Sequence, residues 1–216
     1  MNRTTIINKL ANKIQAKKYL EIGVRKHSLN YDKINIPHKT GVDPDLEKQF
    51  DRDPTYKLTS DEFFAINHDK FDIIFVDGLH EANQVKQDII NSLNVLNEGG
   101  FIVCHDMNPI VYERQLTKND PKRLQYISKE KEKNNPRRGT WNGDCWKAWV
   151  DIRNTHKELK MYVIDTDQGV GVIQRGSTDS PDLFDLNGLE LTYENLDVNR
   201  KRWLNLISTD EFNSMF

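Results

Sequence analysis

The chain has 216 residues, 30% of them charged, and a formal net charge of −2. This length suits one domain, with or without appendages. The balanced charge argues against nucleic acid or an anionic membrane as a partner, because both favour strongly basic proteins. No run of about 18 apolar residues is present, so we expect no membrane-spanning helix. The two cysteines are too few for a disulfide framework, and we expect a cytoplasmic location.

The N-terminal part of the chain carries helix and strand patterns in turn. Apolar residues at helical spacing predict a helix over 4–17, and an apolar run predicts a buried strand over 18–24. A second short strand is expected over 39–43, followed by one helical turn over about 46–50. The segment Thr59–Asp61 is typical of the cap that begins a further helix.

The clearest unit lies in the middle of the chain. Residues 71–77 are apolar, aromatic and β-branched, which is typical of a buried strand. An amphipathic helix over 83–96 follows, ends at Gly99-Gly100 and leads to a further strand over 101–104. A strand, a helix and a strand in about 35 residues form a βαβ unit with a right-handed crossover. We therefore expect an α/β fold.

Residues 107–142 interrupt this pattern. They contain few periodic apolar positions, and between Arg114 and Arg138 nine Lys or Arg residues stand against three acids. A long insertion of this kind is either a functional lid or partly disordered. Its basic side chains either attract a phosphorylated acceptor or form a solvated surface.

The C-terminal part predicts an antiparallel addition to the sheet. A helix over 145–156 precedes two apolar strands, 161–164 and 170–173, and the turn residues between these strands predict a hairpin. We expect one domain over 1–175. Residues 176–216, a loop and a last helix, should pack on this domain or form a homodimer interface.

Two acids stand where the first two strands end. Glu21 closes the first strand and Asp43 closes the second. An open α/β sheet binds its ligands at the carboxyl ends of the strands. Acids there favour a ligand with a cationic end and ribose hydroxyls, as in S-adenosylmethionine. Glu21 would repel the pyrophosphate of a dinucleotide. In nicotinamide-binding proteins a Gly-x-Gly-x-x-Gly motif follows the first strand, and this chain has no such motif there.

Two further motifs carry a resemblance to a known family. They are Asp77-Gly78-Leu79-His80 and His105-Asp106. With them the chain resembles class I S-adenosylmethionine-dependent methyltransferases, well over 18–106 and more loosely over 143–175. It is most similar to the small, macrocin-type O-methyltransferases, some of which bind magnesium. The resemblance implies a Rossmann-like, doubly wound, mostly parallel seven-stranded sheet with an antiparallel C-terminal hairpin strand. It also implies O-methylation of a small hydroxyl-bearing acceptor, such as a sugar or nucleotide sugar.

The resemblance places the cofactor contacts at the strand ends. The matching residues are Glu21, Gly23, Asp43, Ser60, Asp61 and Asp77. Glu21 and Gly23 match the motif at the methionine part of the cofactor, where a glycine permits close approach. Asp43 matches the acid that binds the ribose hydroxyls, and Ser60 and Asp61 match the adenine contacts. Glu21 could instead cap a strand, Asp43 start a turn and Asp61 cap a helix.

The same resemblance implies a proton acceptor and a metal site. Asp77 and Asp106 match metal positions, with His105 as a third ligand or an orienting group. Two neighbouring acids repel unless a cation or proton lies between them, and oxygen ligands favour Mg²⁺, Ca²⁺ or Mn²⁺. His80 matches the residue that takes the proton of the acceptor, although it could instead cap the next helix. Trp141 could stack on the acceptor.

Three other functions remain open at this stage. One is a catalytically inactive module that binds S-adenosylmethionine, because the chain lacks the second glycine that usually follows Gly23 in this family. The second is a nicotinamide-dependent Rossmann oxidoreductase. The third is a metal-dependent hydrolase that uses the same acids and histidines.

Overall fold

The computed structural model describes residues 1–45, 55–133, 140–176 and 185–215. The helical turn expected at about 46–50 lies outside these residues. The helices and strands, with 3₁₀ helices marked η, are α1 (Arg3–Ile14), β1 (Lys18–Ile22), η1 (Tyr31–Lys33), β2 (His38–Val42), β3 (Thr55–Tyr56), α2 (Ser60–Ile66), β4 (Phe71–Val76), α3 (Ala82–Val95), β5 (Leu96–Cys104), η2 (Tyr112–Gln115), α4 (Pro121–Glu132), α5 (Cys145–Thr155), β6 (Leu159–Ile164), β7 (Val170–Arg175), α6 (Tyr193–Leu204), β8 (Leu206–Ile207) and α7 (Thr209–Ser214).

The strands of the described residues form one sheet. Their order is β3-β2-β1-β4-β5-β7-β6-β8. The five neighbouring strands β3, β2, β1, β4 and β5 pair in parallel. Strand β7 lies between β5 and β6 and runs antiparallel to both. This arrangement confirms the α/β, Rossmann-like fold with an antiparallel hairpin. The sheet has eight strands instead of seven, because the two residues of β8 pair in parallel with the outer side of β6.

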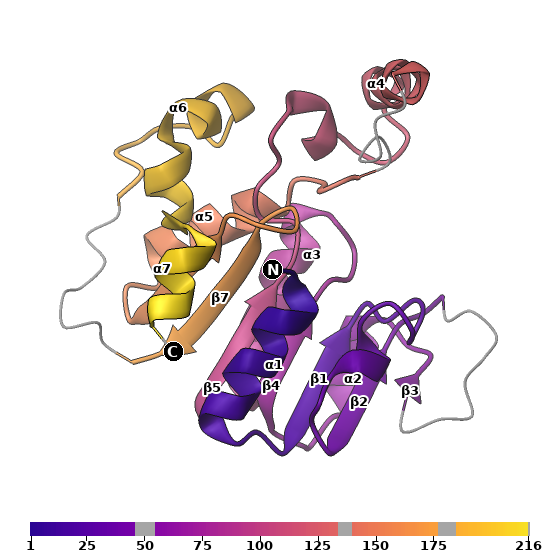
Figure 1. The fold of residues 1–216 in the computed structure, drawn as a ribbon, viewed down its shortest axis with the longest axis vertical. Coiled ribbons are helices and arrows are strands. Elements are labelled where there is room, and N and C mark those ends of the chain that lie inside the picture. Colours follow the sequence, from indigo (N-terminus) through magenta and orange to yellow (C-terminus); the bar gives the residue numbers. More distant parts are fainter. Residues whose placement is uncertain (46–54, 134–139, 177–184, 216) are drawn as a thin grey trace.

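Helices cover both faces of the sheet (Figure 1). Side chains along a strand point alternately to the two faces. Tyr19 of β1 therefore lies in the core beneath α1, with Ile6 and Leu10. Leu20 lies in the other core, with Ile89 of α3 and residues of α5 and α6. This burial on both faces explains why the central strands are apolar runs without alternation.

The start of β5 differs from the prediction. Helix α3 ends at Val95 and β5 begins at once with Leu96, whereas a strand was expected only from Phe101. Leu96 pairs with Phe71, and the register then shifts so that Phe101 pairs with Ile73. The glycines thus lie in an irregular part of the strand, where a side chain at Gly100 would come within 2.6 Å of the carbonyl oxygen of Asp72.

The last helix, which the apolar pattern predicts over 192–207, is interrupted. Helix α6 ends at Leu204, and Asn205 takes a left-handed conformation with φ of 48°. Asparagine tolerates this conformation, and the Asn205 side-chain amide also donates a hydrogen bond to the carbonyl oxygen of Met161 in β6. The chain therefore turns into β8 where continued helix was expected.

The insertion over 107–142 contains two helices within its described residues, η2 and α4. Figure 1 shows α4 standing away from the sheet, beyond the carboxyl ends of β4 and β5. Among residues 1–45, 55–133, 140–176 and 185–215, no helix is both long enough and apolar enough to cross a bilayer.

Candidate active site

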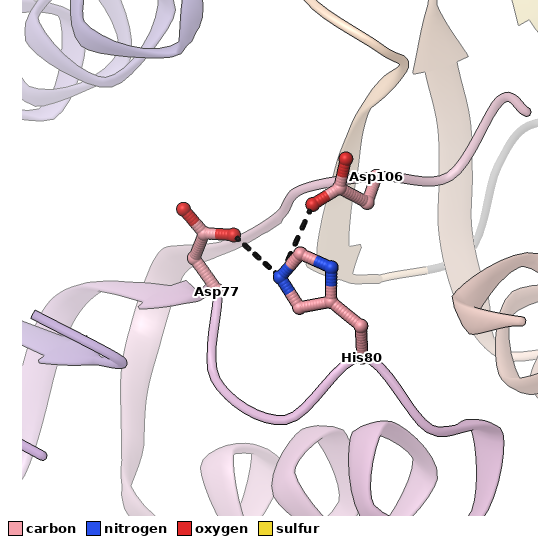
Figure 2. A group of neighbouring side chains, drawn as sticks. All are labelled: Asp77, His80 and Asp106. Atoms are coloured by element: carbon pink, nitrogen blue, oxygen red, sulfur yellow. Dashed lines mark ion pairs between the residues drawn. The ribbon is translucent and has the colours of Figure 1, made fainter. Parts of the chain in front are cut away.

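Three predicted residues meet at the carboxyl edge of the sheet. Asp77 follows β4, Asp106 lies just after β5, and His80 lies in the loop between β4 and α3. Figure 2 shows the three side chains converging: Nε2 of His80 lies 3.4 Å from Oδ2 of Asp106 and 3.7 Å from Oδ1 of Asp77. These distances exceed those of good hydrogen bonds, so space remains for a proton or a small ion to be shared.

Backbone pairing brings the three together. The parallel register places Val76 opposite Cys104. The backbone N–H of His105 then donates to the carbonyl oxygen of Val76, so Asp77 and Asp106 emerge side by side. Asp106 has a φ of 67°, a left-handed conformation that aspartate tolerates better than most residues.

The His80 imidazole is held by Trp141. Its Nδ1 lies 3.2 Å from the carbonyl oxygen of Trp141, and the two rings stack with centroids 4.7 Å apart. A carbonyl oxygen only accepts hydrogen bonds, so Nδ1 carries the proton in this contact. In the neutral ring, Nε2 then presents a lone pair toward Asp77 and Asp106. The contact suits His80 to accept a proton or to bind a cation through Nε2.

Arg3, which was not among the predicted site residues, reaches this cluster from the first turn of α1. Its Nη1 donates to Oδ2 of Asp77 at 2.9 Å and lies 2.8 Å from Nδ1 of His105. Its backbone N–H donates to Oδ2 of Asp167, in the turn between β6 and β7. No local pattern marks Arg3, because its partners lie 74, 102 and 164 residues away in the chain.

These charges shift one another's pKa. Burial alone lowers the pKa of the His105 imidazole, but the carboxylates of Asp106 and Asp77 outweigh burial and hold that pKa well above its usual value. Burial alone raises the pKa of the Asp77 carboxyl, but His105 and Arg3 outweigh it and hold that pKa below its usual value. Asp77 is therefore ionised at neutral pH, with cations on one side of it.

The trio Asp77, His80 and Asp106 fits a divalent cation. One ligand atom from each of these residues lies within 4.8 Å of the other two. Oδ1 of Asp106 is buried without a hydrogen-bond partner, and His80 donates its other ring N–H to a backbone carbonyl, as metal-binding histidines commonly do. The predicted set included His105 in place of His80. Nδ1 of His105 instead lies 2.8 Å from Oδ2 of Asp106 and 2.8 Å from Nη1 of Arg3. His105 therefore helps to position Asp106 within the trio.

Glu21 lies in β1 and is 2% exposed. Its Oε2 accepts hydrogen bonds from the Tyr19 hydroxyl at 2.6 Å and from the Asn30 side-chain amide at 2.9 Å. Burial raises the pKa of Glu21 to about 8, against the effect of these two donors. A cationic ligand beside Glu21 would therefore favour its ionised form.

Asp43 and Gly23 shape the loops above the first two strands. The Asp43 carboxylate accepts hydrogen bonds from the backbone N–H groups of Arg25 and Asp45, so it joins the loop after β1 to the end of β2. Gly23 has a φ of 90°, and a side chain there would lie 2.1 Å from the carbonyl oxygen of Asp77. The contact with the β4 loop is thus sufficient to require a glycine at position 23.

Ser60 and Asp61 are the first two residues of α2 and follow its N-cap residue, Thr59. The side-chain amide of Gln84 donates to Ser60 Oγ, to Asp61 Oδ1 and to Asp88 Oδ1, at 3.1–3.2 Å. The sequence analysis missed Gln84 and the buried Asp88, whose pKa burial raises to about 6. Polar side chains inside an otherwise apolar helix face were the available signal.

Trp141, whose stacking on the acceptor stays a prediction, packs within the protein against the His80 loop and the insertion. Its ring stacks on His80, and the Arg123 guanidinium lies 5.2 Å from the ring centroid. Its indole N–H donates to the carbonyl oxygen of Leu116. Trp141 therefore ties the insertion to the His80 loop.

Residues 40–107 match a family model described as a methyltransferase domain. A search of curated protein sequences found no match.

Solved structures share the fold at low sequence identity. The Podospora anserina methyltransferase PaMTH1, bound to S-adenosylhomocysteine, is 14% identical with a TM-score of 0.53, covering 81% of this chain and 78% of its own. The Bacillus cereus O-methyltransferase, also in complex with S-adenosylhomocysteine, is 15% identical with a TM-score of 0.51, covering 81% and 82%. The Streptomyces achromogenes O-methyltransferase TomG, in complex with S-adenosylmethionine, is 11% identical with a TM-score of 0.51, covering 81% and 80%.

The domain match covers both Asp43 and the two motifs at the ends of β4 and β5. Together with the fold, it confirms the resemblance to S-adenosylmethionine-dependent methyltransferases. Residues 40–107 thus match a methyltransferase domain, and the chain has the Rossmann-like fold of solved O-methyltransferases that bind S-adenosylmethionine or S-adenosylhomocysteine.

Proposed function

We propose that this protein transfers the methyl group of S-adenosylmethionine to a hydroxyl oxygen of a small acceptor, with His80 as the proton acceptor. The observation that carries this proposal is the His80 contact with Trp141. This contact supports a proton on Nδ1, which would leave the lone pair of Nε2 facing the carboxyl edge of the sheet.

The residues suited to hold the cofactor line the ends of β1 and β2 and the start of α2. Glu21 offers a carboxylate to the ammonium group of the methionine part, and Asp43 offers acceptor atoms to the ribose hydroxyls. Ser60 and Asp61, which Gln84 joins to α3, stand on the adenine side. When bound, the cofactor supplies a methyl group on a sulfonium sulfur. The sulfur becomes a neutral thioether when the methyl group is transferred.

His80 would take the hydroxyl proton of the acceptor at Nε2. As that O–H bond breaks, the oxygen forms its bond to the methyl carbon and the carbon–sulfur bond breaks. Asp77 and Asp106 stabilise the imidazolium that forms, because their carboxylates lie 3.7 and 3.4 Å from Nε2. The proton then passes to water. Alignment of the reacting atoms in the site would supply much of the remaining acceleration.

A divalent cation is a second way to activate the same hydroxyl. Asp77, His80 and Asp106 would hold it, and its Lewis acidity would lower the pKa of the acceptor oxygen. A cation bound to Nε2 would occupy the lone pair that a base needs. The two modes are therefore alternatives for this trio, and we favour His80 as the base.

The acceptor is proposed as a small hydroxyl compound. Sugars and nucleotide sugars are the first candidates. Basic residues of the insertion, such as Lys118 and Lys122, could attract the phosphate groups of a nucleotide sugar.

The test is transfer of a labelled methyl group to sugars, nucleotide sugars and phenols. We expect transfer to one class, and we expect His80→Gln to lower kcat by a factor of about 10²–10⁴ while cofactor binding is kept. His156→Gln, which changes a histidine after α5 that is paired with Glu158, is the matched control.

Two outcomes would overturn the proposal. Cofactor binding without transfer to any hydroxyl acceptor would favour an inactive binding module. Wild-type rates in His80→Gln would remove His80 as the base.

A further inference from the structure

Arg3 is the fixed cation of the cluster at the carboxyl edge. Its guanidinium Nη1 lies 2.9 Å from Oδ2 of Asp77, and its Nε lies 3.5 Å from Oδ2 of Asp167. Asp77 therefore shares its carboxylate between two sides. Oδ2 faces Arg3, whereas Oδ1 lies 3.2 Å from Nδ1 of His105 and 3.7 Å from Nε2 of His80.

The backbone holds Arg3 in this position. Its N–H donates to Asp167, and Thr166 in the same turn donates its hydroxyl to the carbonyl oxygen of Met1. The next residue, Thr4, donates to the Asn30 side chain, which itself donates to Glu21. The first turn of α1 is thus bonded to the β6–β7 turn and to the cofactor side of the proposed site.

We propose that Arg3 is the resident cation of this cluster and that it holds divalent cations off the Asp77–His80–Asp106 trio. A guanidinium and a divalent ion that share one carboxylate repel each other across a few ångströms. The trio offers suitable ligand atoms, yet the Arg3 guanidinium already partly neutralises the charge of Asp77. The lone pair of His80 Nε2 then remains available to a proton. The inference rests on the proposed function only in taking this trio as the reactive centre.

The opposite role is that Arg3 orients Asp77 for a metal, so that its loss weakens metal binding. Removing one hydrogen bond from an ionised partner changes affinity by roughly tenfold. Removing a like charge this close to a divalent ion changes affinity by about tenfold even in a water-like medium, and by much more in a buried one. Because Asp106 and Asp77 are held largely away from solvent, the charge effect should dominate.

The experiment measures binding of Mn²⁺ alone to the full chain by electron paramagnetic resonance. Arg3→Gln removes the charge and keeps an amide donor, and Arg3→Lys keeps the charge. Lys13→Gln removes the same charge from the far end of α1, about 15 Å along the helix. We expect Arg3→Gln to bind Mn²⁺ at least tenfold more tightly than the wild type, Arg3→Lys and Lys13→Gln to bind within about threefold of it, and Asp106→Asn in the Arg3→Gln background to lose the gain.

Unchanged, weaker or undetectable Mn²⁺ binding in Arg3→Gln would overturn the inference. Circular dichroism shows whether each variant is folded. If Arg3→Gln does not fold, the wild type decides by nuclear magnetic resonance with Mg²⁺. No Mg²⁺ binding, or an Arg3 Nε resonance that moves to the position of a solvent-exposed arginine as His80 shifts, supports the inference, because the guanidinium then leaves Asp77. Shifts of His80 while the Arg3 Nε resonance keeps the position of a paired guanidinium would overturn it. None of these readouts requires methyl transfer, so failure here leaves the proposed function intact.

Discussion

Among single residues, the buried acid Glu21 shows how a carboxyl group proposed to bind the cofactor can lower the stability of the fold. It is 2% exposed, and its burial raises its pKa to about 8. A carboxyl whose pKa is raised in the folded state binds its proton more tightly there than in the unfolded chain. Its contribution to the free energy of unfolding therefore falls as pH rises from about 4.5 to about 8, and the loss is complete above that range.

We therefore expect Glu21→Gln to be more stable than the wild type at pH 8 by about 2–5 kcal/mol, and nearly equal to it at pH 4.5. The glutamine oxygen can still accept from Tyr19 and Asn30. Urea unfolding of both proteins across this pH range measures the difference. A constant difference between the two, or a less stable variant at pH 8, would contradict the raised pKa of Glu21.

Which residues form the site could be predicted only in part. Asp77, His80 and Asp106 follow strands in recognisable motifs, so their meeting at one edge could be foreseen from the parallel order. Arg3 could not, since nothing near it in the sequence requires a partner. Trp141 was noticed, but its partner His80 lies 61 residues away, and only the folded chain brings the two rings together.

Among the elements, the segment 141–144, just before α5, is hydrogen-bonded to several of the loops at the carboxyl edge of the sheet. The backbone N–H groups of Asn142 and Gly143 donate to the carbonyl oxygen of Arg114 in η2. The Asn142 side-chain amide donates to the carbonyl oxygens of Asp106 and Gln168. Asp144 accepts from the backbone N–H of Ala82, where α3 begins. The segment 141–144 thus holds the loops after β4 and β5, the β6–β7 turn and the insertion in one arrangement.

Gly143 tests this arrangement. It has a φ of 61°, and a side chain there would lie 1.9 Å from the carbonyl oxygen of His80. We expect Gly143→Ala to lose about 3 kcal/mol or more of stability and to lower kcat, because the His80 loop must move. Thermal unfolding and methyl transfer measure the two effects.

Gly188→Ala is the control for backbone strain. Gly188 has a φ of 75°, but nothing lies within 4 Å of the position its side chain would take. This variant should lose only the cost of the left-handed conformation, about 1–2 kcal/mol, and keep its activity. Equal losses in the two alanine variants would show that contact with His80 does not matter.

Helices and strands were predictable where the apolar pattern was strong. β4 and α3 fall close to the expected ranges. β8 and the early start of β5 were not predictable, because one depends on Asn205 bonding to β6 and the other on pairing with Phe71. The helix pattern of α4 was weak, since it lacks a buried apolar stripe and its last turn alternates lysine and glutamate.

At the scale of the whole molecule, the sheet order explains why the acids gather at one edge. Strands β2, β1, β4 and β5 run parallel, so Asp43, Glu21, Asp77 and Asp106 all lie at or near their carboxyl ends. A sheet of this kind offers such an edge to a ligand that is positive at one end and rich in hydroxyls at the other. We propose that S-adenosylmethionine is that ligand.

Calorimetric titration with S-adenosylhomocysteine, with NADH as the comparison, tests this claim most directly. We expect S-adenosylhomocysteine to bind, NADH not to bind, and Asp43→Asn to weaken the binding by about tenfold or more, as loss of a charged hydrogen-bond acceptor should. Asp45→Asn, which changes an exposed neighbour in the same loop, should bind as the wild type does. Equal binding of NADH, or no binding of S-adenosylhomocysteine to the folded protein, would contradict the account.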